Sequence, residues 1–293
     1  MDAYQSYIHA SRYARWLEDK ERRETWDETV DRWWLYMTGK FPALSKRQDV
    51  KDAIYRMDVV PSMRTIMTAG EALERNHVAA YNCSYLAVDD PKAFDEALLV
   101  LMCGTGVGFS VERQFISKLP EVPSELTETE EVVVVADSKE GWAKALRQLI
   151  SRLYAGEIPT WDVSKVRPAG ARLKTFGGRA SGAEPLENLF KFTVGLFKKA
   201  KGRKLNSLEC HDLMCQVAAA VVVGGVRRSA MISLSNLTDD RMRHAKMGNW
   251  WNEQVNRSYA NNSISFTERP DMGSFLREWT AIYESKSGER GIF

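Results

Sequence analysis

Apolar residues recur at helical spacing along several stretches of the chain. Residues 4–58 place tryptophans and tyrosines among glutamate, lysine and arginine side chains, a pattern typical of amphipathic helices. We predict two or three helices there, forming an amino-terminal cap over residues 1–58. Basic and acidic residues are interleaved in this stretch, which favours a structural cap over a nucleic-acid-binding face. The same spacing predicts helices over residues 92–103, 142–154, 186–201, 207–223, 238–258 and 272–283.

Other stretches are rich in β-branched or alternating apolar residues. Pro61 marks a boundary, because the residue before a proline is pushed away from the helical conformation. The acidic run at 125–131 follows two prolines and predicts a surface loop. Strands are predicted at residues 64–67, 81–88, 107–112, 132–135, 231–234 and 259–266. Helices and strands alternate after Pro61, which indicates an α/β domain over residues 59–293. Residues from about 114 to 205 depart from this alternation, and we predict that they form an insertion in the domain.

Composition narrows the class of protein. The chain has 293 residues, 44% hydrophobic and 27% charged, which is typical of an ordinary globular protein. Its net charge of +2 gives no bulk electrostatic reason to expect direct nucleic-acid binding. No apolar run has the roughly 20 residues needed to span a bilayer, and the first residues lack the pattern of a secretory signal, so we expect no membrane association.

Four cysteines in a chain of this length do not form a disulfide framework. They suggest a reducing, cytoplasmic compartment, where cysteine chemistry is catalytic or metal-related. No Cys-x-x-Cys pair occurs, and the nearest spacing is Cys210 to Cys215, so we expect no zinc site. Cys83 differs from the other cysteines by its context, because it lies in a short β-prone run that a helix connects to the glycine loop at 104–108.

Two further glycine-rich segments carry arginines. Residues 165–182 combine glycines with Arg167, Arg172, Lys174 and Arg179, and glycines allow backbone amides to approach phosphate oxygens while arginine supplies forked donors. We favour an anion or nucleotide site there over a solvated basic loop. Residues 224–230 place Gly224, Gly225, Arg227, Arg228 and Ser229 between a helix and a strand; on pattern alone, a phosphate site and a plain turn remain equally open.

These segments together resemble the adenosylcobalamin-dependent, class II ribonucleotide reductases, and within them the monomeric ribonucleoside-triphosphate reductases. The resemblance is carried by Thr68-Ala69-Gly70, Asn82-Cys83-Ser84-Tyr85 with Gly104-Thr105-Gly106-Val107-Gly108, Arg167-Pro168-Ala169-Gly170 through Gly178, Gly224 to Ala230, and Asn261-Asn262-Ser263 with Gly288 to Ile292. It implies the first half of a ten-stranded α/β barrel, which the helical cap precedes.

The resemblance also implies residue roles. Cys83 matches the first of two thiols that reduce the ribose and then close to a disulfide, which a thioredoxin-type reductant reopens. Thr65, Asn82, Thr105 and Gly106 fall where the family binds its substrate, a ribonucleoside triphosphate. Residues at 224–229, with Arg167, Gly170 and Lys174, fall where it binds a deoxynucleotide effector. Adenosylcobalamin is the implied cofactor, and Cys103, Cys210 and Cys215 are assigned packing roles.

The family's Asn-x-Cys-x-Glu motif, which supplies a thiyl cysteine and a glutamate, is absent. We therefore expect an amino-terminal part of a reductase that needs a companion chain or a missing carboxy-terminal part. Two alternatives remain: a non-catalytic deoxynucleotide-binding module and an inactive remnant.

Overall fold

The computed structural model describes residues 1–172, 179–221 and 230–293. The chain forms two compact units. Of the described residues, the first unit comprises Met1–Asn82 and the described part of Gly170–Ala180. The second comprises the described parts of Cys83–Ala169, Ser181–Val222 and Arg228–Phe293. The boundary expected at residue 58 stays a prediction.

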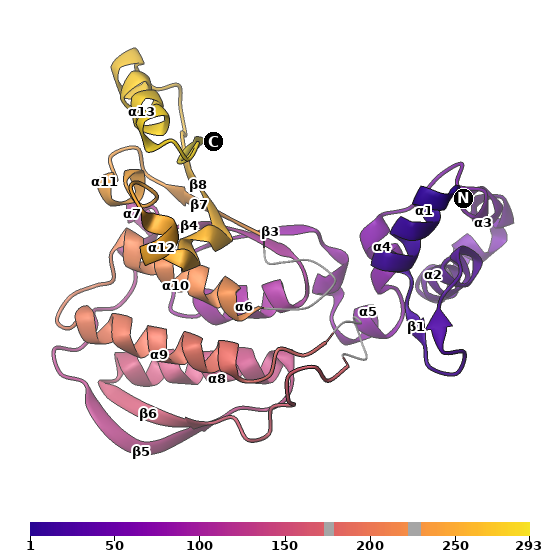
Figure 1. The fold of residues 1–293 in the computed structure, drawn as a ribbon, viewed down its shortest axis with the longest axis horizontal. Helices are drawn as coiled ribbons and strands as arrows, with labels where there is room; N and C mark the ends of the chain where they lie inside the picture. Colours follow the sequence, from indigo (N-terminus) through magenta and orange to yellow (C-terminus); the bar gives the residue numbers. More distant parts are fainter. Residues whose placement is uncertain (173–178, 222–229) are drawn as a thin grey trace. The chain divides into compact units, whose positions relative to one another are not determined.

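Helices dominate the first unit (Figure 1). They are α1 (Ala3–Ile8), which a π-helix (His9–Tyr13) continues, α2 (Trp26–Lys40), α3 (Gln48–Tyr55), α4 (Met63–Thr68) and α5 (Glu71–Arg75), with 3-10 turns at Pro42–Lys46 and His77–Ala80. Asp2 caps α1 and Thr25 caps α2, each through a reciprocal capping box. The predicted helical cap is confirmed, with a short hairpin of β1 (Trp16–Leu17) and β2 (Arg22–Arg23) that the pattern did not indicate.

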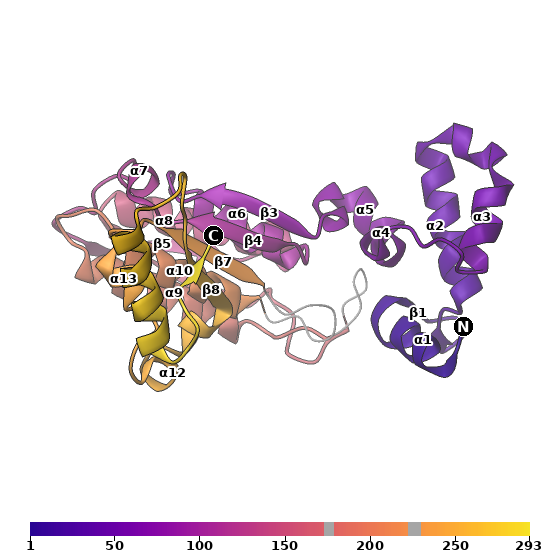
Figure 2. The same cartoon turned by 90° about the horizontal axis from the view of Figure 1, so that it is seen from above.

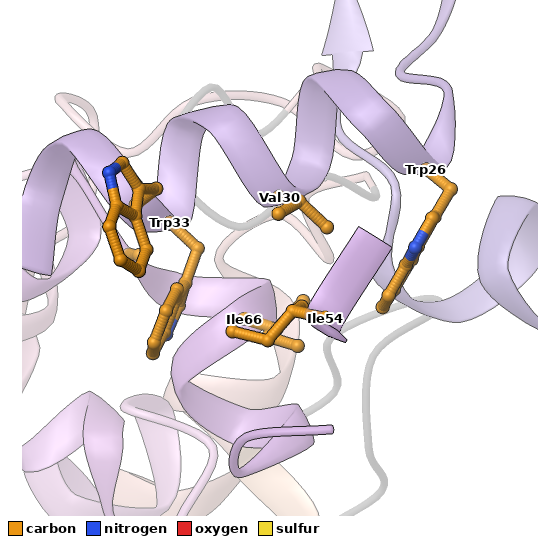
Figure 3. Close-up of a cluster of buried hydrophobic side chains, with 7 residues drawn as sticks. Trp26, Val30, Trp33, Ile54 and Ile66 are labelled. Carbon is orange, nitrogen blue, oxygen red and sulfur yellow. The ribbon is translucent and has the colours of Figure 1, made fainter. Parts of the chain in front are cut away.

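Aromatic side chains of α2 form the core of this unit. Trp26, Val30 and Trp33 pack against Ile54 of α3 and Ile66 of α4 (Figure 3). The indole nitrogens keep hydrogen bonds inside the core, because Trp26 donates to the Tyr55 carbonyl at 3.1 Å. Burial of these large rings explains the tryptophan stripe of the sequence.

The strand predicted at residues 64–67 is wrong, because α4 occupies these residues. The Thr65 hydroxyl donates to the Ser62 carbonyl at 2.9 Å and the Thr68 hydroxyl to the Arg64 carbonyl at 2.8 Å, so β-branched residues satisfy their polar groups within the helix. Ile66 is fully buried against α2. Tertiary packing here overrides a strand propensity that is weak in the first place.

A parallel sheet organises the second unit. Its strands are β3 (Cys83–Ala87), β4 (Gly106–Ser110), β7 (Met231–Ser235), β8 (Ala260–Ile264) and β9 (Gly291–Ile292), hydrogen-bonded in the order β3-β4-β7-β8-β9. All four pairings are parallel. The α/β class is confirmed, and the strands match the predicted ones apart from the unpredicted short β9.

Helices cover one face of this sheet in layers (Figures 1 and 2). α6 (Ala93–Met102) packs on β3 and β4, and α10 (Ser207–Ala220) packs on β7. Below them lie α8 (Lys139–Tyr154) and α9 (Glu184–Lys199), which contact α6 and α10 respectively. The predicted helices at these positions are confirmed within a few residues.

A second, two-stranded parallel sheet lies under α8. It pairs β5 (Thr127–Val134) with β6 (Glu157–Asp162). The surface loop predicted at 125–131 is wrong, because most of the acidic run belongs to β5. Glutamates are depleted in strands, but here Glu128, Glu130 and Glu131 lie exposed, so they keep their hydration while Val133 turns inward and is buried.

The remaining elements surround the carboxy-terminal strands. They are α7 (Arg113–Ile116), α11 (Asp240–Arg243), α12 (Trp250–Glu253), a 3-10 turn at Val255–Tyr259 and α13 (Met272–Ser285). The predicted helical stretch at 238–258 is therefore divided into short pieces. None of the described helices combines the length and the apolar character that a membrane crossing requires.

Candidate functional site

Cys83 is the first residue of β3, and its side chain is exposed. Cys103, Cys210 and Cys215 are buried, and burial raises the pKa of the Cys210 thiol far above its usual range. Reactive cysteines need solvent access, whereas buried ones are inert. Exposure therefore separates Cys83 from the other three thiols.

The sheet face that carries Cys83 is the one opposite α6 and α10. In the strand register, Cys83 lies beside Gly106 and Tyr85 lies beside Gly108, whose neighbour on the other side is Ile232. Val107 and Phe109, which alternate with these glycines, are buried toward the helices. Glycines at two positions of the neighbouring strand leave space above the sheet next to the thiol.

Thr105 and Gly106 stand where α6 returns to the sheet. Gly104 adopts a φ of +79° between them and the helix, a conformation that glycine reaches without strain. Thr105 is buried, with 1% of its surface exposed, and Gly106 begins β4 beside Cys83. The structure thus brings together three of the predicted catalytic and substrate-binding residues: Cys83, Thr105 and Gly106.

Thr65 and Asn82 belong to the first unit. The Thr65 hydroxyl is occupied, since it donates to Ser62 and accepts from the indole nitrogen of Trp33 at 3.2 Å. Asn82 is exposed and immediately precedes β3 in the chain. Thr65 therefore contributes to the packing of α2 on α4, and its substrate-binding role stays a prediction.

Of the predicted effector residues, Arg167 and Gly170 are described. Arg167 pairs with Asp137 through two contacts of 2.8 and 3.0 Å, so its charge is balanced within the chain. Gly170 has a φ of +86°, and its backbone nitrogen donates a hydrogen bond to the Ala180 carbonyl at the base of the basic segment. Lys174, Gly224, Gly225, Arg227, Arg228 and Ser229 lie outside the described residues.

Arg172 shows how the base of this segment is held. Its guanidinium lies 5.1 Å from the centre of the Trp16 ring and 3.1 Å from the Glu18 carboxylate. Both partners belong to the β1–β2 hairpin region, which lies in the same compact unit as Arg172. Arg172 is thus attached to the β1–β2 hairpin region by contacts that the sequence did not reveal.

A buried polar cluster links α10 to β8, and the sequence analysis missed it. His211 is fully buried; its Nδ1 lies 3.0 Å from Asp212 and its Nε2 lies 2.9 Å from the Asn262 side-chain oxygen. Burial lowers the pKa of His211, but Cys215 and Asp212 outweigh it and raise the value to about 10. Asp212 also binds Arg257 at 2.7 Å. The only signal in the sequence was a histidine within an apolar helix.

Glu289 joins the same region from the end of the chain. Its carboxylate accepts from the backbone nitrogen of Asn262 at 2.8 Å and pairs with the buried Lys246 at 2.8 Å. Among the described residues, no group of histidine, cysteine or acidic side chains forms a candidate metal site. The polar residues behind the sheet therefore build a scaffold, and the open face carries the thiol.

Comparisons with known proteins agree with this geometry. Residues 121–194 match the model of the insertion domain of B12-dependent ribonucleotide reductase. A crystal structure of a B12-dependent (class II) ribonucleotide reductase superposes with a TM-score of 0.74 at 24% identity, over 89% of this chain and 45% of that one. The chain resembles the class II ribonucleotide reductases. The resemblance expected from the sequence is confirmed, and so is the fold, as part of the larger α/β structure.

Curated relatives lead to the same family. The adenosylcobalamin-dependent ribonucleoside-triphosphate reductase of Lacticaseibacillus paracasei is 27% identical, over 96% of this chain and 46% of the relative. That of Lactobacillus leichmannii is 27% identical over 78% of this chain and 40% of the relative. A putative reductase of this type from Mycobacterium phage D29 is 27% identical over 74% and 38%. The chain thus spans less than half the length of the relatives, and corresponds to their amino-terminal portion.

Proposed function

We propose that this chain is the amino-terminal part of an adenosylcobalamin-dependent ribonucleoside-triphosphate reductase, and that Cys83 is its first reducing thiol. The exposure of Cys83 on the open face of the parallel sheet carries the proposal. A thiol there can approach a bound sugar without displacing other side chains, because the adjacent position is Gly106.

The reaction that this thiol serves is a two-electron reduction. Cys83 and a second thiol each give up a hydrogen; the 2′-hydroxyl of the ribose leaves as water, a hydrogen takes its place on carbon, and the two sulfurs join as a disulfide. A thioredoxin-type reductant then restores both thiols. The second thiol and the Asn-x-Cys-x-Glu motif would come from a companion chain or from further sequence.

Adenosylcobalamin would supply the radical that starts the reaction. We assign no described residue to it. The groove that Arg243, Leu276 and Thr280 line between α11 and α13 has about 560 Å³ and is open to solvent, a size that suits a drug-sized ligand and not a corrin. That groove does not suit the cofactor, and the residues that hold adenosylcobalamin would come mostly from a companion chain or from further sequence.

The insertion and the basic segment support an effector site. The match of residues 121–194 to the reductase insertion domain lies within the segment predicted at about 114–205. Gly170 and Arg172 stand at the base of a glycine-rich basic segment, and such segments bind phosphates through backbone amides and arginines. A deoxynucleotide effector is the ligand that we propose.

The test is turnover by the completed reductase, in which this chain is supplied with a polypeptide that carries the Asn-x-Cys-x-Glu motif. Cys83→Ser should abolish multiple turnover with a dithiol reductant while leaving cleavage of the cobalamin detectable. Cys103→Ser serves as the matched control, because Cys103 is buried. Unchanged turnover in Cys83→Ser would show that another thiol reduces the sugar. Nucleotide binding without any turnover would favour the non-catalytic module.

A further inference from the structure

Tyr85 lies on the same sheet face as Cys83, two residues further along β3. Alternate residues of a strand point to the same side, and the two Cα atoms are about 6.6 Å apart at roughly 3.3 Å per residue. The Tyr85 side chain is 57% exposed, although it belongs to a sheet whose other face is buried. A large aromatic ring thus stands beside the exposed thiol.

Gly108 lies beside this ring. A Cβ atom at Gly108 would lie 3.7 Å from Cδ2 of Tyr85 and 3.4 Å from Cγ2 of Ile232. The edge of the tyrosine ring therefore occupies the space beside a missing side chain. Burial raises the pKa of Tyr85, and a side-chain interaction with Ser110 on β4 offsets part of the rise. The edge of the ring thus lies against the backbone position of Gly108.

We propose that Tyr85 is a stacking platform for the base of the nucleotide whose sugar lies at Cys83. This inference rests on the proposed function and adds a substrate-positioning residue to it. Sugar and base are adjacent rings, so a base reaches a platform one side-chain repeat away from the thiol. Stacking of a base on an aromatic ring is sequence-tolerant, because every base has a π-face. Such a platform fits an enzyme that accepts several bases.

The test measures how nucleotides protect Cys83 from alkylation by iodoacetamide. Cys83 is the exposed cysteine of the chain, so modification reports on its surroundings. GTP and ribose 5-triphosphate are compared as probes, because the second has the sugar and phosphates but no base. The variants are Tyr85→Phe, which keeps the ring, Tyr85→Leu, which keeps apolar bulk, and Tyr85→Ala. Tyr283→Ala, at a tyrosine 70% exposed on α13, is the control.

We expect the GTP concentration for half-protection to rise about tenfold or more in Tyr85→Leu and Tyr85→Ala, from the loss of stacking. Tyr85→Phe and Tyr283→Ala should match the wild type, and ribose 5-triphosphate should protect all variants alike. Equal protection by GTP in every variant would overturn the platform while leaving the proposed function intact. Equal weakening of both probes would also overturn it, since the ring would then act through the shape of the site. Absence of protection in the wild type would count against the proposed function itself.

Discussion

The Nε2 atom of His211 lies 2.9 Å from the side-chain oxygen of Asn262, and this contact joins the second turn of α10 to the middle of β8. Both ring nitrogens of His211 face acceptors, because Nδ1 faces the carboxylate of Asp212 as Nε2 faces the oxygen of Asn262. A neutral imidazole has one donor and one acceptor, whereas an imidazolium has two donors. The geometry therefore holds His211 in its charged form behind the sheet that carries Cys83.

Removal of the His211 ring should destabilise the protein. His211→Ala leaves the Asn262 oxygen without this partner and deprives the half-buried Asp212 of one of its donors. We expect a loss of about 2–4 kcal/mol in the free energy of unfolding, the range for exposing buried polar groups plus a cavity. Urea denaturation followed by tryptophan fluorescence measures it. His244→Ala, at an exposed histidine, should change stability by less than about 0.5 kcal/mol. A similarly small loss in His211→Ala would contradict the role of the cluster.

The stability of the protein should depend on pH through His211. Its folded-state pKa of about 10 lies above the ordinary value of 6.5. A raised pKa means that the stabilisation is complete below about pH 6.5 and is lost as the pH rises toward 10. We expect the urea midpoint of the wild type to fall across this window more steeply than that of His211→Gln. Parallel pH profiles would show that His211 does not change its charge there.

The buried carboxylate of Glu278 should be essential to the carboxy-terminal region. It lies between Arg243, whose Nε donates to it at 2.7 Å, and Arg290, whose Nη2 lies 2.9 Å away. Glu278→Leu leaves Arg290, itself 2% exposed, without its carboxylate. We expect a loss of about 3–5 kcal/mol, measured by urea denaturation.

The control for this prediction is Glu284→Leu, an exposed glutamate on the same helix, which should be nearly neutral. The double variant Glu278→Leu with Arg290→Met removes both charges of one pair and should recover part of the loss. A double variant no more stable than Glu278→Leu alone would contradict this expectation and would indicate that Arg290 stabilises the protein through its other contacts, to Ser235, Asn236 and Leu237.

The four cysteines should differ sharply in reactivity. Cys83 is exposed and the other three are buried, so one thiol per chain should react with iodoacetamide in the native protein and four in urea. Peptide mapping by mass spectrometry identifies the modified residue. Cys83→Ser should remove the native reaction, whereas Cys215→Ser should leave it unchanged. Fast native labelling of Cys103 would contradict its burial at the end of α6.

Much of the fold follows from local patterns. Apolar spacing identified α6, α8, α9 and α10, because each buries an apolar stripe. It also identified α13, whose buried residues are the polar Ser274 and Glu278. β-prone runs identified β3, β4, β7 and β8. The choice of Cys83 as the candidate reactive cysteine also came from the sequence, because Cys83 lies at the start of a β-prone run that precedes a glycine loop. These features depend on residues that are close together in the chain.

Tertiary structure decided what depends on distant residues. Residues 63–68 form a helix because Ile66 packs under α2, and the acidic run joins β5 because β6 pairs with it. No spacing rule places His211 against Asn262, since hydrogen bonds between side chains 51 residues apart depend on how α10 crosses the sheet. The sequence alone determined most elements of the second unit and singled out Cys83 among the four cysteines. The packing decided that Tyr85 and Gly108 stand side by side at that cysteine, because strand register is set by the whole sheet.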